Sequence, residues 1–288
     1  MSPGGLAERR RRYAAGLVAA LPRPEPRIEA AFGSVRREDF LGPPPWAVLG
    51  FSHLYHTDDP AELYQDVLIA LDQARGLNNG SPALHALMLH HLAVAAGDAV
   101  LHVGAGGGYY TAILAELAGR SGHVTAVEFD RRLADLARRN LAAWSNVTVL
   151  QGDGAGFPAA AVQRIYVNFG IAAPADRWLD WLAPGGTLVF PLCVPNPHGG
   201  AEQRRHSARG AVFCLTRTGA GFAAQHVTPA AFVCAEGPLA GDAALQQALF
   251  DAFGRGGAEF VRSFRRGSSP TERCWFWSPA WSLSYDPP

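Results

Sequence analysis

Three glycines and an acid stand at a spacing that could bind a cofactor. Gly104, Gly106 and Gly108 follow an apolar run. Glu128 ends a second apolar run further along the chain. Glycines let the backbone turn tightly and approach a ligand, and the free amides of a helix that begins near Tyr109 would face that ligand. A carboxylate about 20 residues beyond such a turn can accept both hydroxyls of a ribose. The pattern predicts a site for a nucleotide-bearing cofactor.

Further polar residues lie near or at the ends of the apolar runs. Asp153 and Gly154 follow the run at 147–151, and Asn168 follows the run at 165–167. Ligands of open α/β sheets bind in the crevice at the carboxyl ends of the strands, although an Asp-Gly pair is also an ordinary turn. His102 interrupts the run before the glycines, where it could contact the cofactor or be a hydrogen-bonded core residue. All four are candidate cofactor-binding residues.

The elements that would position these residues alternate between strand and helix. Strands are expected at 100–103, 123–128, 147–151, 165–167 and 187–190, with helices between them. Two later apolar runs, 211–216 and 224–233, are separated by glycines without a helix, which is typical of a hairpin. The sequence therefore predicts an α/β fold with a Rossmann-like, doubly wound, mostly parallel sheet that ends in an antiparallel hairpin.

The flanking segments have a different character. Residues 1–76 are expected to form an N-terminal cap, with helices at 6–21 and 27–32 and an irregular segment up to about residue 60. The cofactor-binding core is expected at 77–235, and a C-terminal α+β extension at 236–288. That extension holds one helical pattern, 242–253, and two strand-like pieces, 258–264 and 273–277.

Composition argues against some partners. Lys plus Arg and Asp plus Glu both number 25, and the pI is about 7.2, so no overall field attracts nucleic acid or an anionic membrane. No apolar run is long enough to span a bilayer and the N-terminus lacks a secretory stretch, so we expect a cytoplasmic protein. The four cysteines are widely spaced without metal-ligand spacing, and we expect buried thiols and no metal site. The sequence does not indicate the oligomeric state.

The segment before Pro82 contains a turn and a helix start. An Asn-Gly pair marks the turn, Ser81 is a good N-cap, and Pro82 suits the first helical position. Ser81 could therefore be only a cap or could also contact a ligand. His85, His90 and His91 in the following helix have no metal spacing and are expected on its surface.

Two cofactor classes fit the glycine pattern. The dinucleotide fingerprint needs glycine at the sixth position counted from Gly104, and Tyr109 stands there. Glycine at the first, third and fifth positions, with acids at Glu128 and Asp153 and a final hairpin, fits S-adenosylmethionine-dependent methyltransferases better. NAD binding by an oxidoreductase remains the alternative.

From Phe40 to about Leu192 the chain resembles the protein-L-isoaspartate O-methyltransferase family. The segments that carry the resemblance are Arg37-Glu38-Asp39-Phe40, Tyr64-Gln65-Asp66, the loop from Gly104 to Tyr109, and Gly152-Asp153-Gly154. The resemblance implies the class I methyltransferase fold and S-adenosyl-L-methionine as cofactor. It also implies that Glu128 binds the ribose, that Asp153 lies by the adenine, and that the loop before Pro82 faces the methyl acceptor. Asn78, Asn79 and Ser81 are then the acceptor-side candidates.

Two departures from the family pattern bear on the reaction. The family has Thr-Ile-Ser where this chain has Asn78, Asn79 and Gly80, and His102 stands where the family usually has an acid. We therefore expect O-methylation of a carboxylate on a peptide or small molecule, by an enzyme diverged from isoaspartyl methyltransferases. A carboxylate is already ionised at neutral pH and needs no general base. A cofactor-binding module without turnover is a further alternative.

Overall fold

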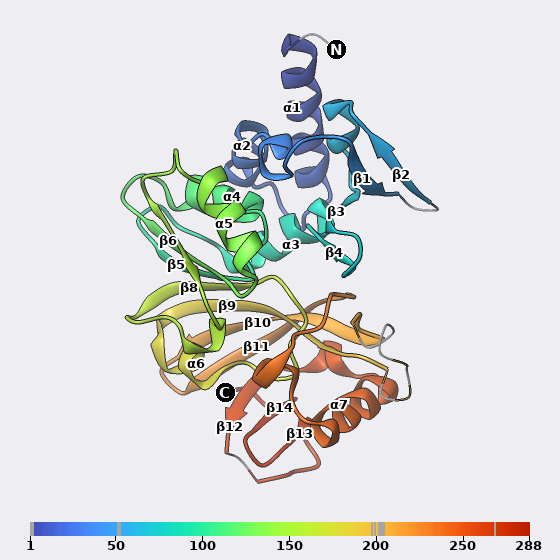
Figure 1. The fold of residues 1–288 in the computed structure, drawn as a ribbon. Helices are drawn as coiled ribbons and strands as arrows, with labels where there is room; N and C mark the ends of the chain where they lie inside the picture. The colour runs from blue at the N-terminus through green and yellow to red at the C-terminus, as the bar shows by residue number, and fades with distance from the viewer. Residues whose placement is uncertain (1–2, 51–52, 197, 199, 201–204, 268) are drawn as a thin grey trace. The chain divides into compact units, whose positions relative to one another are not determined.

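The computed structural model describes residues 3–50, 53–196, 198, 200, 205–267 and 269–288. The chain divides into two compact units, residues 1–154 and 155–288. Figure 1 labels most of the helices and strands of both.

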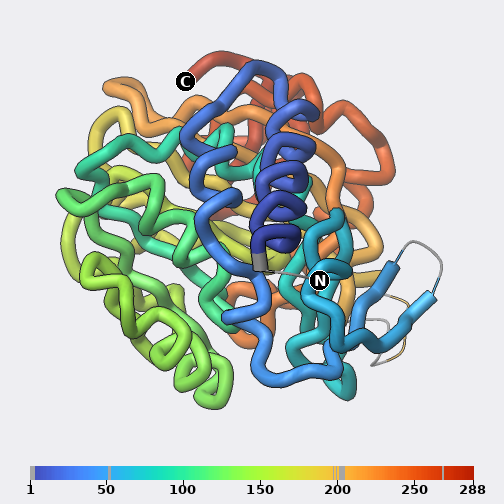
Figure 2. Tube along the Cα trace, turned by 90° about the horizontal axis from the view of Figure 1, so that it is seen from above, coloured from blue at the N-terminus to red at the C-terminus, as the bar shows by residue number. Residues whose placement is uncertain are grey.

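The first unit begins with two helices that pack against each other. They are α1 (Pro3–Ala19) and α2 (Pro26–Ser34), which lie side by side in Figure 2. Tyr13 and Leu17 of α1 are buried, as are Ile28 and Phe32 of α2. The two amphipathic patterns therefore form the expected helices, and α2 begins with a proline at its first turn, where a missing N–H costs nothing.

A small antiparallel sheet follows, and its strands up to residue 57 lie where the sequence predicted an irregular segment. Its order is β2-β1-β3-β4, and the strands are β1 (Trp46–Leu49), β2 (Leu54–Thr57), β3 (Leu68–Asp72) and β4 (Leu77–Asn78). Trp46, Val48 and Ile69 form a buried cluster with residues of the intervening turns. The prediction was wrong here because strands of two to five residues between prolines show no periodic pattern, and packing in this cluster stabilises them.

The rest of the first unit alternates strand and helix as predicted. Its elements are α3 (Pro82–Leu92), β5 (Ala99–Val103), α4 (Tyr109–Ala118), β6 (His123–Glu128), α5 (Arg131–Asn140) and β7 (Val147–Gln151). β6 pairs in parallel with β5 and with β7. Residues 100–103 are all buried, which agrees with a parallel strand covered on both faces.

The second unit is a sheet whose first pair is parallel and whose remaining pairs are antiparallel. Its order is β8-β9-β10-β11-β12-β14-β13. The bounds are β8 (Val162–Val167), α6 (Asp176–Trp181), β9 (Leu182–Val194), β10 (Arg209–Thr218), β11 (Gly221–Pro229), α7 (Ala243–Arg255), β12 (Ser263–Arg266), β13 (Cys274–Trp277) and β14 (Trp281–Ser284). The predicted hairpin is β10 and β11.

Short 3-10 helices complete the chain. They are η1 (Arg37–Phe40), η2 (Pro60–Leu63), η3 (Gly154–Gly156), η4 (Gly237–Ala240) and η5 (Ala258–Phe260). The strand-like piece predicted at 258–264 is therefore helical at its start and joins the sheet only at β12. In the described part of the chain, no helix combines the length and apolar character that crossing a membrane requires.

Candidate functional site

The predicted cofactor residues of the first unit meet at one edge of its parallel strands. Val103 pairs with Val127, and Glu128 pairs with Gln151. The carboxyl ends of β5, β6 and β7 therefore lie side by side, which brings the glycine loop, Glu128 and the loop at Asp153 to the same edge. This is the edge at which open α/β sheets bind ligands.

Glu128 is a buried carboxylate that holds the glycine loop. Its Oε2 accepts the backbone N–H of Gly106 at 2.7 Å, and its Oε1 accepts that of Asp130 at 2.9 Å. The side chain is 8% exposed, and burial raises the pKa of its carboxyl above the ordinary value, while these N–H donors oppose the shift. Each oxygen of an ionised carboxylate keeps a further lone pair, so Glu128 can accept two more hydrogen bonds.

The glycine loop leads directly into α4. Gly108 is the N-cap residue, adopts φ +96°, and no side chain caps the helix. A Cβ on Gly108 would lie 2.8 Å from Leu141 Cδ1, so a side chain here would meet both backbone strain and a clash. Gly108 has no side chain that could accept the first amides of α4, and such a helix start suits a negatively charged group.

Asp153 stands in a loop that packs tightly on β5. Its neighbour Gly154 is buried, and a Cβ there would lie 2.1 Å from Val103 Cγ1. This contact requires glycine and brings the Asp153 loop against the end of β5. Asp153 itself is exposed at this edge.

His102 is fully buried in β5 and bonds to α4. Its Nδ1 lies 2.8 Å from Thr111 Oγ1. Burial lowers the pKa of His102 to about 3, so its imidazole is neutral at physiological pH. A neutral imidazole cannot form the ion pairs that an acid at this position could form.

The side chains of the turn before α3 are engaged within the protein. Asn78 Oδ1 accepts the N–H of Gly80 at 2.9 Å. Asn79 Oδ1 accepts the N–H of Ile69 at 3.0 Å and a guanidinium N–H at 3.2 Å. Ser81 caps α3, because its Oγ accepts the N–H of Leu84 at 3.2 Å, and its hydroxyl donates to Asp66 at 2.7 Å. These bonds give the turn one defined shape.

Comparison with known families matches residues 24–218 to the model described as Protein-L-isoaspartate(D-aspartate) O-methyltransferase (PCMT). That match covers well over half of the chain. The chain belongs to this family.

Relatives of the same name agree with this assignment. The protein-L-isoaspartate O-methyltransferase of Rhodopseudomonas palustris is 35% identical over 235 residues, which cover 80% of this chain and 92% of that protein. The one of Methanosarcina mazei is 38% identical over 126 residues, which cover 42% of this chain and 52% of that protein. The second match thus spans about half the length of the relative.

Solved structures share the fold. A structure named protein-L-isoaspartate O-methyltransferase has a TM-score of 0.64 at 20% identity and covers 96% of this chain and 88% of its own. A putative protein-L-isoaspartate O-methyltransferase of Plasmodium falciparum, solved with S-adenosyl-L-homocysteine, has a TM-score of 0.58 at 16% identity and covers 81% of this chain and 97% of its own. The family and the Rossmann-like class I methyltransferase fold predicted from the sequence are confirmed.

The remaining two residues predicted to bind the cofactor are Tyr109 and Asn168. Tyr109 is 3% exposed and packs edge-on against Phe32 and Phe40. Asn168 follows β8 in the second unit and is partly exposed. Their contact with a cofactor stays a prediction.

Sequence reasoning missed three features of the site. Phe129, directly after Glu128, is 67% exposed although it is a large aromatic. Its place after a strand-ending acid was an available signal.

Arg37 is fully buried and bonds to Asn79, and its acceptors are mostly backbone carbonyls, which no sequence pattern reveals. His85 and His90, expected on the surface of α3, are 0% and 7% exposed. The imidazole of His85 stacks on Tyr110 with ring centroids 3.6 Å apart.

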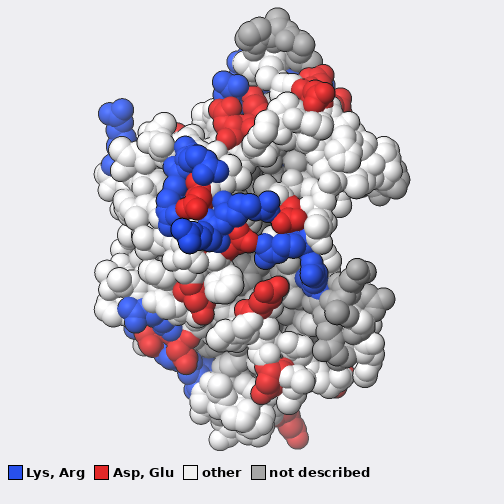
Figure 3. Space-filling model, in the orientation of Figure 1, with Lys and Arg blue, Asp and Glu red and all other residues white. Residues whose placement is uncertain are grey.

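Charges of both signs alternate on the face shown in Figure 3. Basic side chains gather over α5, with acidic ones among them. Arg132 pairs with Asp72 at 2.7 Å and Arg138 with Asp135 at 2.6 Å. This face is therefore mixed in charge. Within the described ranges, no group of three metal-ligating side chains lies together.

Proposed function

We propose that this chain is an S-adenosyl-L-methionine-dependent O-methyltransferase that methylates a carboxylate of a peptide. The observation that carries the proposal is the bond between Glu128 and the Gly106 amide at the strand edge, beside the uncapped start of α4. The relatives' names, protein-L-isoaspartate O-methyltransferase, support the same reaction class. A small-molecule carboxylate is the alternative acceptor.

The residues at this edge fit the groups of the cofactor. The free lone pairs of Glu128 would accept the two ribose hydroxyls, and the exposed ring of Phe129 offers an apolar face for the adenine. Asp153 would accept a hydrogen bond from the adenine amino group. The amides at the start of α4 suit the cofactor's carboxylate. Gly104, Gly106 and Gly108 give the cofactor loop its positive φ angles, and His102, Gly154, Tyr109 and Asn168 remain proposed neighbours.

Methyl transfer to a carboxylate does not require an ionisable side chain as a general base. S-adenosyl-L-methionine supplies, when bound, a methyl group on a sulfonium that an acceptor oxygen can displace in line. The chain has to align the acceptor and exclude water. A carboxylate, with a pKa of about 4 in solution, is already ionised at pH 7. A buried, neutral His102 is compatible with such a base-free reaction.

The turn at residues 77–81 would present main-chain groups and one side-chain donor to the acceptor. Asn78 and Ser81 are occupied in shaping the turn. Nδ2 of Asn79 is buried, and among the described residues it has no acceptor, whereas its Oδ1 is bonded twice. Asn79 Nδ2 is therefore our proposed side-chain contact to the acceptor carboxylate. We further propose that residues 77–235 form the cofactor-binding core, with 1–76 as its cap and 236–288 as an extension.

Calorimetric titration with S-adenosylhomocysteine tests the cofactor site. Wild type should bind, and Glu128→Ala and Asp153→Ala should each weaken binding by about tenfold or more, because a hydrogen bond to a charged group contributes about 1.5–3 kcal/mol. Asp135→Ala removes an exposed acid of α5 and should bind like wild type. Absence of binding by wild type, or equal binding by all variants, would refute the proposal. Binding of NAD without binding of S-adenosylhomocysteine would favour an oxidoreductase.

Transfer of a labelled methyl group tests the acceptor class. The wild-type protein should label peptides that carry an isoaspartyl carboxylate or another free carboxylate, and the product should release methanol on mild alkaline treatment, as an ester does. Peptides with every carboxyl amidated are the control. Cofactor binding without transfer to any carboxylate would instead support a module without turnover.

A further inference from the structure

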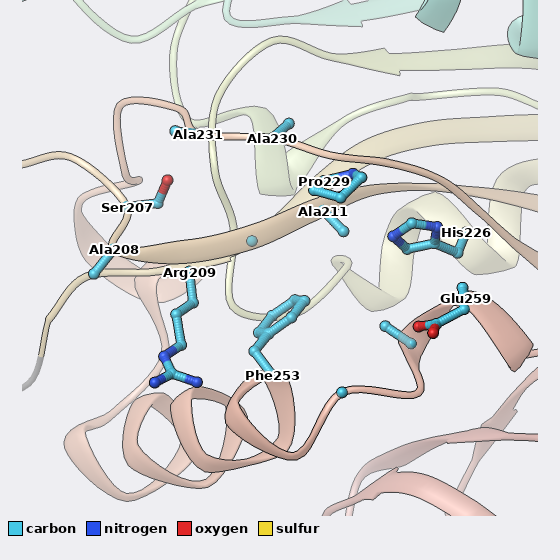
Figure 4. A pocket seen from close by; sticks show the side chains of 13 residues that line it. Ser207, Ala208, Arg209, Ala211, His226, Pro229, Ala230, Ala231, Phe253 and Glu259 are labelled. Carbon is cyan, nitrogen blue, oxygen red and sulfur yellow. The ribbon is translucent and has the colours of Figure 1, made fainter.

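A pocket in the second unit lies apart from every residue assigned so far. It has a volume of about 540 Å³ and lies between the start of β10, the end of β11, the C-terminal end of α7 and η5 (Figure 4). This volume is in the range of about 300–1,000 Å³ typical of small-molecule sites. The family match ends at residue 218, so α7 and η5 lie beyond it.

Arg209 offers a cation at one end of this pocket. Its guanidinium lies over the ring of Phe250, with its central carbon 4.2 Å from the ring centroid. Gly254 makes room for it, because a Cβ there would lie 2.4 Å from Nη1 of Arg209. Among the residues that the structure describes, no carboxylate pairs with this guanidinium. Stacking holds the plane of the group and leaves its N–H edge available for an anion.

The opposite end of the pocket carries a negative charge. Figure 4 shows Glu259 and His226 close together, with Phe253 between them and Arg209. The ring of His226 meets Phe213 edge-on at 5.7 Å. Burial lowers the pKa of His226, and the charge of Glu259 only opposes this, so the imidazole is neutral at pH 7. The Glu259 carboxylate is exposed and, within the described ranges, forms no salt bridge.

The wall between the two ends is apolar. Phe253 and Pro229 supply apolar surface, and the small side chains of Ala211 and Ala230 leave the pocket open beside them. Apolar groups of a ligand would leave water here at a gain of about 25 cal/mol per Å² buried. From one end of the pocket to the other, the lining thus presents a cation, an apolar wall and an anion.

From this order of groups we infer that the pocket binds a short zwitterionic peptide. The peptide carboxylate pairs with Arg209, its ammonium group lies at Glu259 with His226 accepting a hydrogen bond, and an apolar side chain packs on Phe253. This inference is independent of the proposed methyl transfer, because it uses no residue of the cofactor site.

The experiment is a calorimetric titration of the full chain with three related ligands. They are alanyl-phenylalanine, its C-terminal amide and its N-acetyl derivative. The amide lacks the negative carboxylate, and the N-acetyl derivative lacks the positive ammonium group. Wild type should bind the zwitterion at least about tenfold more tightly than either derivative. Equal affinity for all three, or no detectable binding of the zwitterion at millimolar concentration, overturns the inference.

Matched variants assign each charge to its residue. Arg209→Gln should bind the zwitterion and its amide equally, and Glu259→Gln should bind the zwitterion and its N-acetyl form equally. Arg262→Gln removes an exposed arginine that does not line the pocket and should behave as wild type. A variant at Arg209 that still prefers the carboxylate overturns the inference. If that variant does not fold, as judged by circular dichroism, the wild-type ligand series alone decides.

Discussion

At the scale of single residues, Glu128 links the cofactor loop to the strand edge. Its two oxygens accept backbone N–H groups from opposite sides, one from the glycine loop and one from the start of α5. Burial of this carboxyl raises its pKa. The protonated form therefore appears at a higher pH than for an exposed glutamic acid, and it has fewer acceptor sites to offer a ribose.

We predict that affinity for adenosine falls as the pH is lowered toward the raised pKa of Glu128. Adenosine carries no ionised group near neutral pH, so the change reports on the protein. The loss should approach tenfold per pH unit below that pKa, by about 1.36 kcal/mol per unit. Calorimetry across a pH series measures it, and Glu128→Gln should bind weakly with little pH dependence over the same range.

The effect of Glu128 on stability has the opposite sign. Because its pKa is raised in the folded state, the folded protein binds this proton more tightly than the unfolded chain does. The contribution of Glu128 to the free energy of unfolding therefore rises as the pH falls through the raised value. If, as the pH falls, adenosine affinity and the contribution of Glu128 to the free energy of unfolding both decrease, the role assigned to Glu128 is contradicted.

At the scale of elements, Arg37 joins three segments of the first unit. Its guanidinium donates to Leu63 O at 2.7 Å, Val67 O at 2.7 Å and Asn79 Oδ1 at 3.2 Å, with a further donation to the carbonyl of Gln65. It also lies 5.9 Å from the ring centroid of Tyr109 at the start of α4. One buried cation thus fixes the loop before β3, the turn before α3 and the helix after the glycines.

We predict that Arg37→Met lowers the free energy of unfolding by about 3 kcal/mol or more. The change leaves several buried carbonyl groups without a donor, and each such group costs about 1–3 kcal/mol. Urea denaturation measures this loss. Arg36→Met is the matched control, because the Arg36 side chain is 56% exposed and solvent screens its ion pairs with Glu38 and Asp39, so its effect should stay below about 1 kcal/mol. Similar losses for both variants would contradict this role.

At the scale of the whole molecule, the two units differ in their chemistry. The proposed cofactor edge belongs to residues 1–154, whereas all four cysteines belong to residues 155–288. The cysteines are free thiols, and Cys193 and Cys214 are buried. Burial raises the pKa of Cys193, and it raises the pKa of Cys214 and of Cys234 to about 12.

We predict that one thiol of the native protein reacts readily with a disulfide reagent at pH 8, and that this thiol is Cys274. The other three have few thiolate ions at that pH, so they react only as the second unit opens. Counting thiols by the absorbance of the released reagent, before and after denaturant, measures this. Cys274→Ser should abolish the fast phase, and rapid reaction of all four in native wild type would contradict the prediction.

The sequence alone determined the family, the fold class and the order of strand, glycine loop, helix and acid from Val100 to Glu128. These features depend on local rules, since an all-apolar run predicts a buried strand and Ser81 caps the helix expected after it. Local pattern is sufficient where each residue's role is set by neighbours within a few positions.

Only the tertiary structure decided which side chains are buried or hydrogen-bonded within the protein and which are exposed to a ligand. The hydrogen bond that Arg37 donates to Asn79 joins segments more than 30 residues apart, and the burial of His85 and the exposure of Phe129 depend on the packing around each ring. The strands at 46–57 likewise form because Trp46 and Val48 pack on residues beyond them. Contacts between distant segments leave no period or spacing in a single sequence, so folding in three dimensions was needed to reveal them.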